Sequence, residues 1–190
     1  SFVDGDRTPP LQSSDKIRRN NPGQPITMTN FASGSFPDAF GSVEALEDYM
    51  TAPDDALIAD LATIDGDIIV LGVGGKMGPT LARMAKRAAP DKNIIGVARF
   101  SEAGLKEKLN DWDIETITCD LLDRDDVTAL PECANVVFMA GRKFGSSGSP
   151  DLTWAMNVHV PAIVAEAFRD SRIVAFSSGN HAQAVAWSGR

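Results

Sequence analysis

Cysteine, basic residues and long apolar runs are all scarce in this sequence. Only Cys119 and Cys133 occur among 190 residues, and neither lies in a CxxC or mixed Cys/His spacing. The sequence therefore predicts no disulfide framework and no metal site, and a reducing, cytoplasmic setting fits it best. No run approaches the ~18 apolar residues of a membrane span, and residues 1–30 lack a basic segment followed by an apolar one. A membrane partner is not expected.

Positive charge is outnumbered by negative charge. The chain carries 18 Lys and Arg against 26 Asp and Glu, a formal net charge of -8 at pH 7. An acidic surface repels the phosphate backbone of nucleic acids, so no nucleic-acid partner is expected. Hydrophobic residues make up 43% of the chain and charged residues 23%, which is the balance of a globular protein with one packed core.

The first third of the chain does not read as part of a sheet. Residues 1–41 are rich in Pro, Asn, Ser, Asp and Gly and have no apolar period, which predicts an N-terminal arm, partly disordered. Residues 42–66 predict a helical lead-in. Ser42 is the expected N-cap of a helix through Met50, and Pro53 is expected to open a second helix that Gly66 closes. Four apolar residues share one face of that second helix, namely Leu57, Ile58, Leu61 and Ile64.

After Gly66, short apolar runs alternate with amphipathic stretches, as in repeated βαβ units. The predicted strands are 68–71, 93–98, 116–119, 136–140 and 173–176. The predicted helices are 77–88, 101–110, 124–129 and 152–169. Five strands with four connecting helices predict an α/β fold, a doubly wound parallel sheet of the Rossmann type with an N-terminal arm and helices. This domain is expected over residues 67–180, followed by an atypical tail at 181–190.

The turn after the first predicted strand carries the strongest chemical signal. Its sequence, GVGGKMG over residues 72–78, follows an apolar strand and opens a helix. We expect Gly72 to turn the chain off the strand, Gly75 to leave space for a pyrophosphate, and Gly78 to let the helix pack closely. Amides of the turn, including those of Lys76 and Met77, would then face the anion at the start of the helix. The spacing excludes a Walker A loop.

The residue after the second strand bears on which nucleotide the turn would hold. S-adenosylmethionine also binds at such a turn, but methyltransferases usually need an acidic residue at the end of the second strand to hold the ribose. Here that strand ends in Arg99. A guanidinium can clamp a 2′-phosphate, which favours NADP over NAD as the cofactor. A methyltransferase remains the less favoured alternative.

Five segments in the same order resemble the extended short-chain dehydrogenase/reductases, the NAD-dependent epimerase/dehydratase family, over about residues 67–180. Besides the glycine turn, the similar segments are CDLL at 119–122, AGRK at 140–143, Asn157-Val158 on the following helix, and FSSGN at 176–180. The resemblance implies hydride transfer between a nicotinamide and a sugar-type carbon. It implies an oxidoreductase acting on a nucleotide-sugar-like substrate.

The resemblance also implies roles for individual residues. The glycines hold the pyrophosphate, and Asp120 with Leu121 flanks the adenine. Ala140, Gly141 and Lys143 run along the nicotinamide-side ribose, and Asn157 belongs to the same cofactor site. Ser178 is the implied catalytic residue, which hydrogen-bonds a hydroxyl or carbonyl group of the substrate.

The sequence departs from the family in its proton relay. The family uses a Tyr-x-x-x-Lys pair, whereas the one tyrosine here is Tyr49 and no lysine follows Lys143. We therefore expect a cofactor domain that is incomplete for catalysis, with a truncation or frame shift near residue 181. Self-association into a homo-oligomer is expected from the uncovered sheet edge. A non-catalytic NAD(P)-sensing or interaction module is the alternative.

Overall fold

The computed structural model describes residues 38–142 and 148–175, and these form a parallel sheet with helices on both faces. The strand order is β3-β2-β1-β4-β5, with all four neighbouring pairs parallel. The strands are β1 (Ile68–Leu71), β2 (Ile94–Ala98), β3 (Glu115–Thr118), β4 (Asn135–Phe138) and β5 (Arg172–Ala175). The order turns back at β1, since β2 and β3 lie on one side of it and β4 and β5 on the other, so the doubly wound Rossmann-type arrangement is confirmed.

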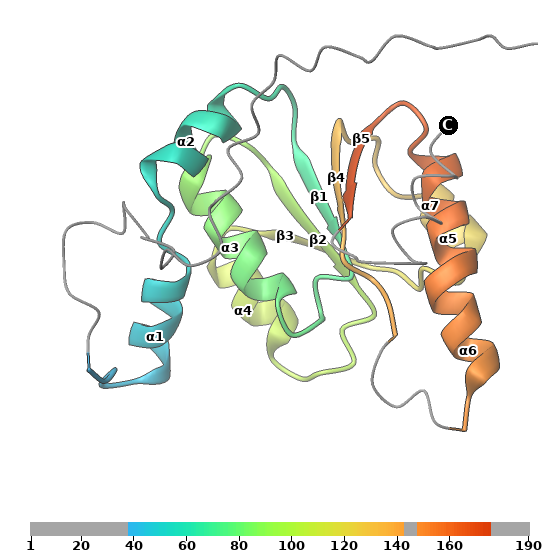
Figure 1. Ribbon diagram of the computed structural model, residues 1–190, viewed down its shortest axis with the longest axis horizontal. Coiled ribbons are helices and arrows are strands. Elements are labelled where there is room, and N and C mark those ends of the chain that lie inside the picture. Colours follow the sequence, from blue (N-terminus) through green and yellow to red (C-terminus); the bar gives the residue numbers. More distant parts are fainter. Residues whose placement is uncertain (1–37, 143–147, 176–190) are drawn as a thin grey trace, which may run out of the picture. The chain divides into compact units, whose positions relative to one another are not determined.

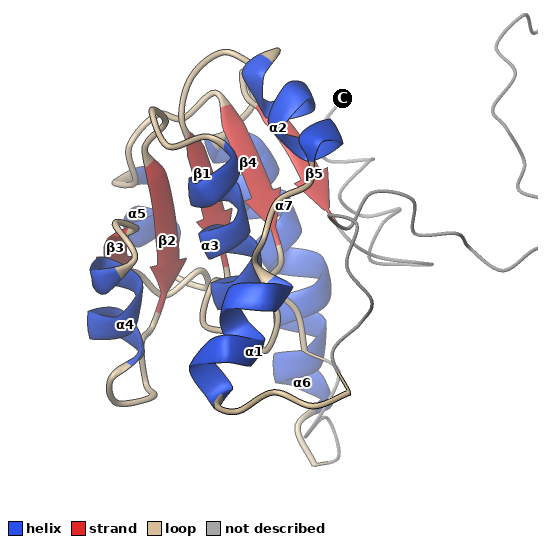
Figure 2. Cartoon of the chain, turned by 90° about the vertical axis from the view of Figure 1, so that its left-hand side faces the viewer, coloured by secondary structure: helices blue, strands red, loops and turns tan. Residues whose placement is uncertain are grey.

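The helices divide between the two faces of the sheet. Figures 1 and 2 show α1 to α4 on one face and α5 to α7 on the other. The first group is α1 (Val43–Met50), α2 (Asp55–Ala62), α3 (Gly78–Ala88) and α4 (Leu105–Asp111). The second group is α5 (Arg124–Thr128), α6 (Pro150–Trp154), the π-helical segment η1 (Ala155–His159) and α7 (Val160–Ala167).

The central strand β1 is buried on both faces, and its side chains alternate between two apolar cores. Ile68 and Val70 pack with the α3 and α4 side, while Ile69 and Leu71 pack with residues of α5 and α7. All four are at most 4% exposed. This explains why β1 is a continuous apolar run and not an alternating one.

The lead-in helices differ in detail from the sequence prediction. Ser42 caps α1 as expected, and its hydroxyl accepts a hydrogen bond from the Ala45 amide. The second helix begins at Asp55 and not at Pro53, because Asp54 supplies the cap by accepting from the Leu57 amide at 2.8 Å. It ends at Ala62 with Thr63 as its C-cap, so Ile64 and Gly66 lie beyond it.

The predicted face of α2 is therefore only partly correct. Leu61 and Ile64 pack against the core, but Ile58 is 41% exposed. Gly66 does adopt a positive φ of 78°, at a turn where a Cβ would lie 2.7 Å from the Cβ of Ala134. Its function is to let two chain segments approach before β1, and not to cap a helix.

Two other helices have boundaries that the sequence did not reveal. The helix expected from residue 101 starts at Leu105, because Gly104 with φ 82° is its N-cap. Residues 101–104 are consequently a loop. The helix expected over 152–169 begins earlier, at Pro150, and contains the π-helical segment η1. Across the described ranges, none of the helices has the length and apolar character needed to cross a bilayer.

Candidate functional site

A cleft of about 260 Å³ lies where the parallel strands β1 to β4 end. The carboxyl ends of parallel strands meet at one edge of the sheet, and the order reverses between β1 and its neighbours. This is the place where doubly wound folds bind their ligands. Its walls are formed by the segments that follow β1, β2, β3 and β4, and by Leu105 and Met156.

Gly72 forms the corner between β1 and the cleft. Its φ is 89°, and a Cβ on it would lie 2.7 Å from the backbone nitrogen of Ala140 at the end of β4. Its own amide donates to the carbonyl of Val97 at 2.9 Å, which continues the sheet ladder by one residue. A side chain at position 72 is therefore excluded both by conformation and by space.

Gly75 and Gly78 serve different purposes in the same turn. A Cβ on Gly75 would meet only the carbonyl oxygen of Gly72, at 3.4 Å, so a side chain there would project into the cleft that Gly75 lines. A Cβ on Gly78 would lie 2.1 Å from the carbonyl oxygen of Val73, within the turn itself. Gly78 thus permits close packing of the turn on the start of α3. Its predicted role in packing the helix against the sheet stays a prediction.

The turn leaves backbone donors available. In the described part of the chain, the amides of Gly74, Lys76 and Met77 donate to no acceptor. They precede α3, whose N-terminal end carries a partial positive charge. A Gly-lined turn with free amides at a helix start fits the pyrophosphate of a dinucleotide.

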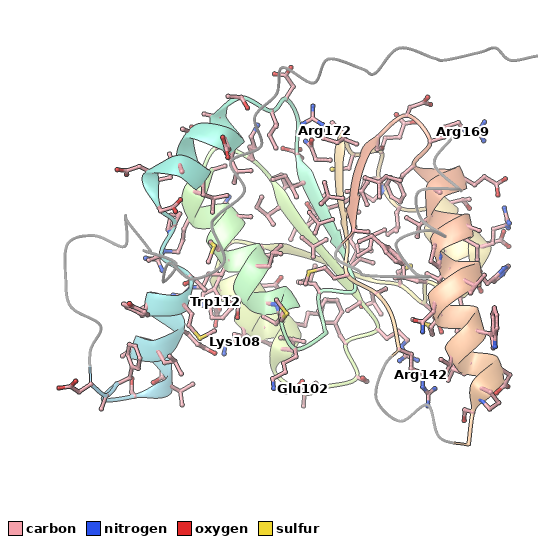
Figure 3. All side chains as sticks on the ribbon, viewed as in Figure 1. Glu102, Lys108, Trp112, Arg142, Arg169 and Arg172 are labelled. Atoms are coloured by element: carbon pink, nitrogen blue, oxygen red, sulfur yellow. The ribbon has the colours of Figure 1, made fainter. Side chains whose placement is uncertain are left out.

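The wall after β2 carries charges of both signs. Arg99, Ser101 and Glu102 line the cleft and are exposed. Phe100 between them adopts a positive φ of 49°, which is unusual for an aromatic residue and turns the chain sharply after the strand. Glu102, labelled in Figure 3, is an acidic group that the sequence reasoning did not single out.

The wall after β3 is formed by Cys119, Asp120 and Leu121. The Asp120 carboxylate accepts a hydrogen bond from the amide of Leu122 at 3.1 Å, which closes a local turn. Burial and the nearby carboxylates of Asp126 and Asp120 raise the pKa of the Cys119 thiol to about 11. Cys119 is therefore a protonated, buried side chain at the base of the cleft and not a nucleophile at neutral pH.

The wall after β4 is held from outside by Asn157. Its side-chain oxygen accepts from the amide of Arg142 at 2.7 Å, and its side-chain nitrogen donates to the carbonyl of Arg142 at 2.9 Å. The two bonds fix the backbone that carries Ala140 and Gly141 along the cleft. Asn157 lies in the π-helical segment η1, a local distortion that is frequent at functional sites.

The structure brings most of the predicted cofactor residues to this one edge of the sheet. Those that line the cleft are Gly72, Gly75, Arg99, Asp120, Leu121, Ala140 and Gly141. Gly78 lies at the start of α3, Asn157 acts through the Arg142 backbone, and Met77 is 69% exposed beside the turn. Lys143 and Ser178 lie outside the described residues.

Sequence reasoning missed several residues that line the cleft. They are Gly74, Ala98, Phe100, Ser101, Glu102, Leu105, Cys119, Met139 and Met156. Most lie at the carboxyl end of a strand or within four residues beyond it, so the rule that ligands bind beyond the carboxyl ends of parallel strands could have found them. No group of three or more His, Cys, Asp or Glu within residues 38–142 and 148–175 is arranged to hold a metal ion.

Residues 68–185 match the sequence profile of the NAD dependent epimerase/dehydratase family. No curated protein sequence matches the chain significantly.

Solved structures similar in fold include three that are named as enzymes. Helicobacter pylori ADP-L-glycero-D-manno-heptose-6-epimerase has a TM-score of 0.54 and 18% identity, over 60% of this chain and 40% of that one. Clostridium difficile L-threonine dehydrogenase has a TM-score of 0.52 and 16% identity, over 59% of this chain and 36% of that one. Bordetella bronchiseptica WbmG, solved with NAD, has a TM-score of 0.50 and 15% identity, over 60% and 38%. The chain therefore spans about two fifths of the length of these proteins.

Proposed function

Because the chain belongs to the NAD dependent epimerase/dehydratase family, we propose that it binds NADP or NAD in the cleft beyond β1 to β4. In this proposal it is the cofactor-binding part of an oxidoreductase that acts on a nucleotide-sugar-like substrate. Two of the fold relatives support the assignment by what their names state, one as a nucleotide-sugar epimerase and one as a complex with NAD.

One observation carries the proposal, namely the position of Gly75. The residue lies in a turn with three unpaired amides at the start of α3, and a Cβ on it would meet only the Gly72 carbonyl oxygen, at 3.4 Å. Nothing in the packing of the described residues demands a glycine here, whereas Gly72 and Gly78 are demanded by close backbone contacts. A ligand lying against the turn supplies the missing reason.

The other walls would hold the remaining parts of the dinucleotide. Asp120 and Leu121 flank the adenine, and Ala140 and Gly141, held by Asn157, lie along the nicotinamide-side ribose. When bound, the nicotinamide supplies the hydride acceptor or donor of the family's chemistry. Lys143 and Ser178, outside the described residues, would contact the ribose and the substrate respectively.

The loop after β2 would choose between NADP and NAD. Arg99 can pair with a 2′-phosphate, while Glu102 on the same wall can accept hydrogen bonds from a free ribose hydroxyl. We favour NADP, since a charge-assisted contact is worth about 1.5–3 kcal/mol, or roughly tenfold or more in affinity. Arg99→Ala should remove this preference, and Glu102→Gln should increase it.

A calorimetric titration of the 190-residue chain with NADP, NAD and S-adenosylmethionine tests the proposal. We expect both dinucleotides to bind at one site, NADP more tightly, and S-adenosylmethionine to bind weakly or not at all. Binding of S-adenosylmethionine alone would favour the methyltransferase alternative. Equal affinity for NADP and NAD would leave Arg99 without a role in the choice of cofactor.

A binding module without turnover is the second candidate function. One observation favours it: Tyr49, the one tyrosine of the sequence, packs on Phe40 with ring centroids 5.2 Å apart and does not line the cleft. The phenol that the family uses for proton transfer is therefore not supplied by this tyrosine.

A further inference from the structure

Helix α1 lies outside the residues that match the family, which begin at residue 68, yet it is joined to the sheet domain by charged groups. None of its own residues is buried. In its C-terminal half, Glu47, Asp48 and the cap residue Thr51 face cations of α3 and α4. Cations are favoured at this end of a helix.

The bonds from α1 to α3 are short and partly buried. A side-chain oxygen of Asp48 lies 2.6 Å from the guanidinium of Arg83. The Arg87 guanidinium donates to the Asp48 carbonyl and to the Thr51 hydroxyl, each at 2.8 Å, and Thr51 is 1% exposed. Two turns of α3 are therefore tied to the end of α1.

The same half of α1 is also bound to α4. Glu47 forms an ion pair with Lys108 of α4. Lys108 and Arg83 both lie over the ring of Trp112, with their charged atoms 4.9 Å and 4.4 Å from its centroid. Figure 3 shows Lys108 and Trp112 at the side of α4 that faces α1. A single aromatic ring thus links the α3 cation to the α4 cation.

These bonds border a second hollow that adjoins the cleft. The hollow, of about 660 Å³, is lined by Glu47 and Lys108 on one side and by the glycine turn and the loop before α4 on the other. It shares Gly74, Gly75, Glu102 and Leu105 with the cleft described above. Glu47 of α1 therefore lines a hollow that shares part of the glycine turn with the proposed nucleotide site.

We propose that α1 is a clip that positions the glycine turn against the loop after β2. The clip holds α3 and α4 at a fixed separation through Asp48 and Glu47, and the N-terminal ends of these two helices carry the two walls of the nucleotide cleft. Glu47, Asp48 and Lys108 are positioning residues and do not touch the ligand. The inference rests on the proposed binding of NADP or NAD.

The test is a set of matched variants of the 190-residue chain, titrated calorimetrically with NADP. Glu47→Gln with Asp48→Asn removes both carboxylates that hold the clip. The control, Asp55→Asn with Asp60→Asn, removes two carboxylates from α2 that form no ion pair among the described residues. We expect NADP to bind about three- to tenfold more weakly to the clip variant, which is the size of effect that two partly exposed ion pairs can have. The affinity of the control variant for NADP should be unchanged.

A double-mutant cycle separates positioning from direct contact. If Glu47 and Lys108 act as one clip, then Glu47→Gln, Lys108→Gln and the double variant should weaken binding by similar factors. If Lys108 instead contacts a phosphate, Glu47→Gln would release it and tighten binding, and that result would overturn the inference. Circular dichroism and thermal melting of each variant establish that it is folded.

The titrations distinguish a failure of the clip from a failure of the proposed dinucleotide binding. No binding of either dinucleotide by the unaltered chain would overturn the proposed function and the clip together. Tight binding by the unaltered chain with equal affinity in the clip variant would overturn the clip alone.

Discussion

The three glycines that the sequence pattern singled out in the turn after β1 have three different surroundings. Gly72 has a positive φ and touches the β4 backbone, Gly78 touches the turn itself, and Gly75 faces the cleft. The sequence could predict all three because a strand, a glycine spacing and a helix follow in order. It could not predict Gly74, where a Cβ would lie 3.1 Å from the Cβ of Ala98, because that contact depends on how β2 lies beside β1.

Gly78→Ala should destabilise the fold strongly. The new Cβ would lie 2.1 Å from the Val73 carbonyl oxygen, and a backbone atom cannot move aside without distorting the turn. We expect a loss of more than about 2 kcal/mol in the free energy of unfolding, measured with urea. Gly41→Ala is the control, since no atom of the described residues lies within 4 Å of its Cβ position. Equal stability of the two variants would contradict the packing described for the turn.

Cys119 should resist alkylation in the folded protein. It is 3% exposed, and burial together with nearby carboxylates raises its pKa to about 11 from an ordinary value of 9.0. Iodoacetamide at pH 8 should therefore label Cys119 only after denaturation. Mass spectrometry of the labelled chain measures this. Since the folded state keeps the proton that the unfolded state loses, stability should fall as pH rises from about 9 towards 11. Rapid labelling of the native chain at pH 8 would show that the thiol is accessible and ionised.

At the scale of elements, the strands were predictable to within a residue or two and the helix ends were not. The strands β1, β2 and β4 are short and largely buried, which leaves little freedom for their limits. The helices begin where a cap is available, and neither Asp54 nor Gly104 stands out from the surrounding polar residues in the sequence. The π-helical turn η1 was not predicted, and within it Asn157 bonds to the backbone of Arg142, a contact distant in sequence.

Asn157→Ala should loosen the wall after β4. The variant removes one acceptor and one donor from the Arg142 backbone, and unsatisfied groups of this kind cost about 1–3 kcal/mol. We expect lower stability in urea and weaker dinucleotide binding, because Gly141 would no longer be held along the cleft. Asn157→Asp keeps the acceptor and loses the donor. Its stability and its affinity for the dinucleotide should therefore lie between those of the unaltered chain and those of Asn157→Ala. Unchanged binding in both variants would limit Asn157 to a role in folding.

At the scale of the whole molecule, the residues predicted to bind the cofactor lie at one edge of the sheet, where other residues also line the cleft. The predicted residues come together because the parallel strands all end there, which topology alone ensures. Glu102 was not foreseen because it sits in a stretch that read as the start of a helix. The attachment of α1 was also unforeseen, since it depends on ion pairs between residues 35 and 61 positions apart in the sequence. The partition into arm, lead-in, domain and tail, and self-association, stay predictions.

The 190-residue chain alone should bind cofactor without turning over a nucleotide sugar. General acid–base catalysis contributes about 10²–10⁴ in rate, and Tyr49 packs on Phe40 away from the cleft. The absorbance change of NAD(P)H with a panel of nucleotide sugars is the measurement, with Tyr49→Phe as the control. Turnover that follows the purified chain, and that Tyr49→Phe leaves unchanged, would mean that another residue transfers the proton.

The most direct test of the account is the affinity of Gly75→Val for NADP and NAD, measured by calorimetry beside the unaltered chain. A Cβ at this position meets only the Gly72 carbonyl oxygen, at ordinary contact distance, so we expect the variant to fold with unchanged thermal stability. Its side chain would occupy the space in which the pyrophosphate is proposed to lie. The account predicts that the unaltered chain binds and that the variant loses binding by at least about tenfold, whereas equal affinity in a folded variant would contradict a dinucleotide at this turn.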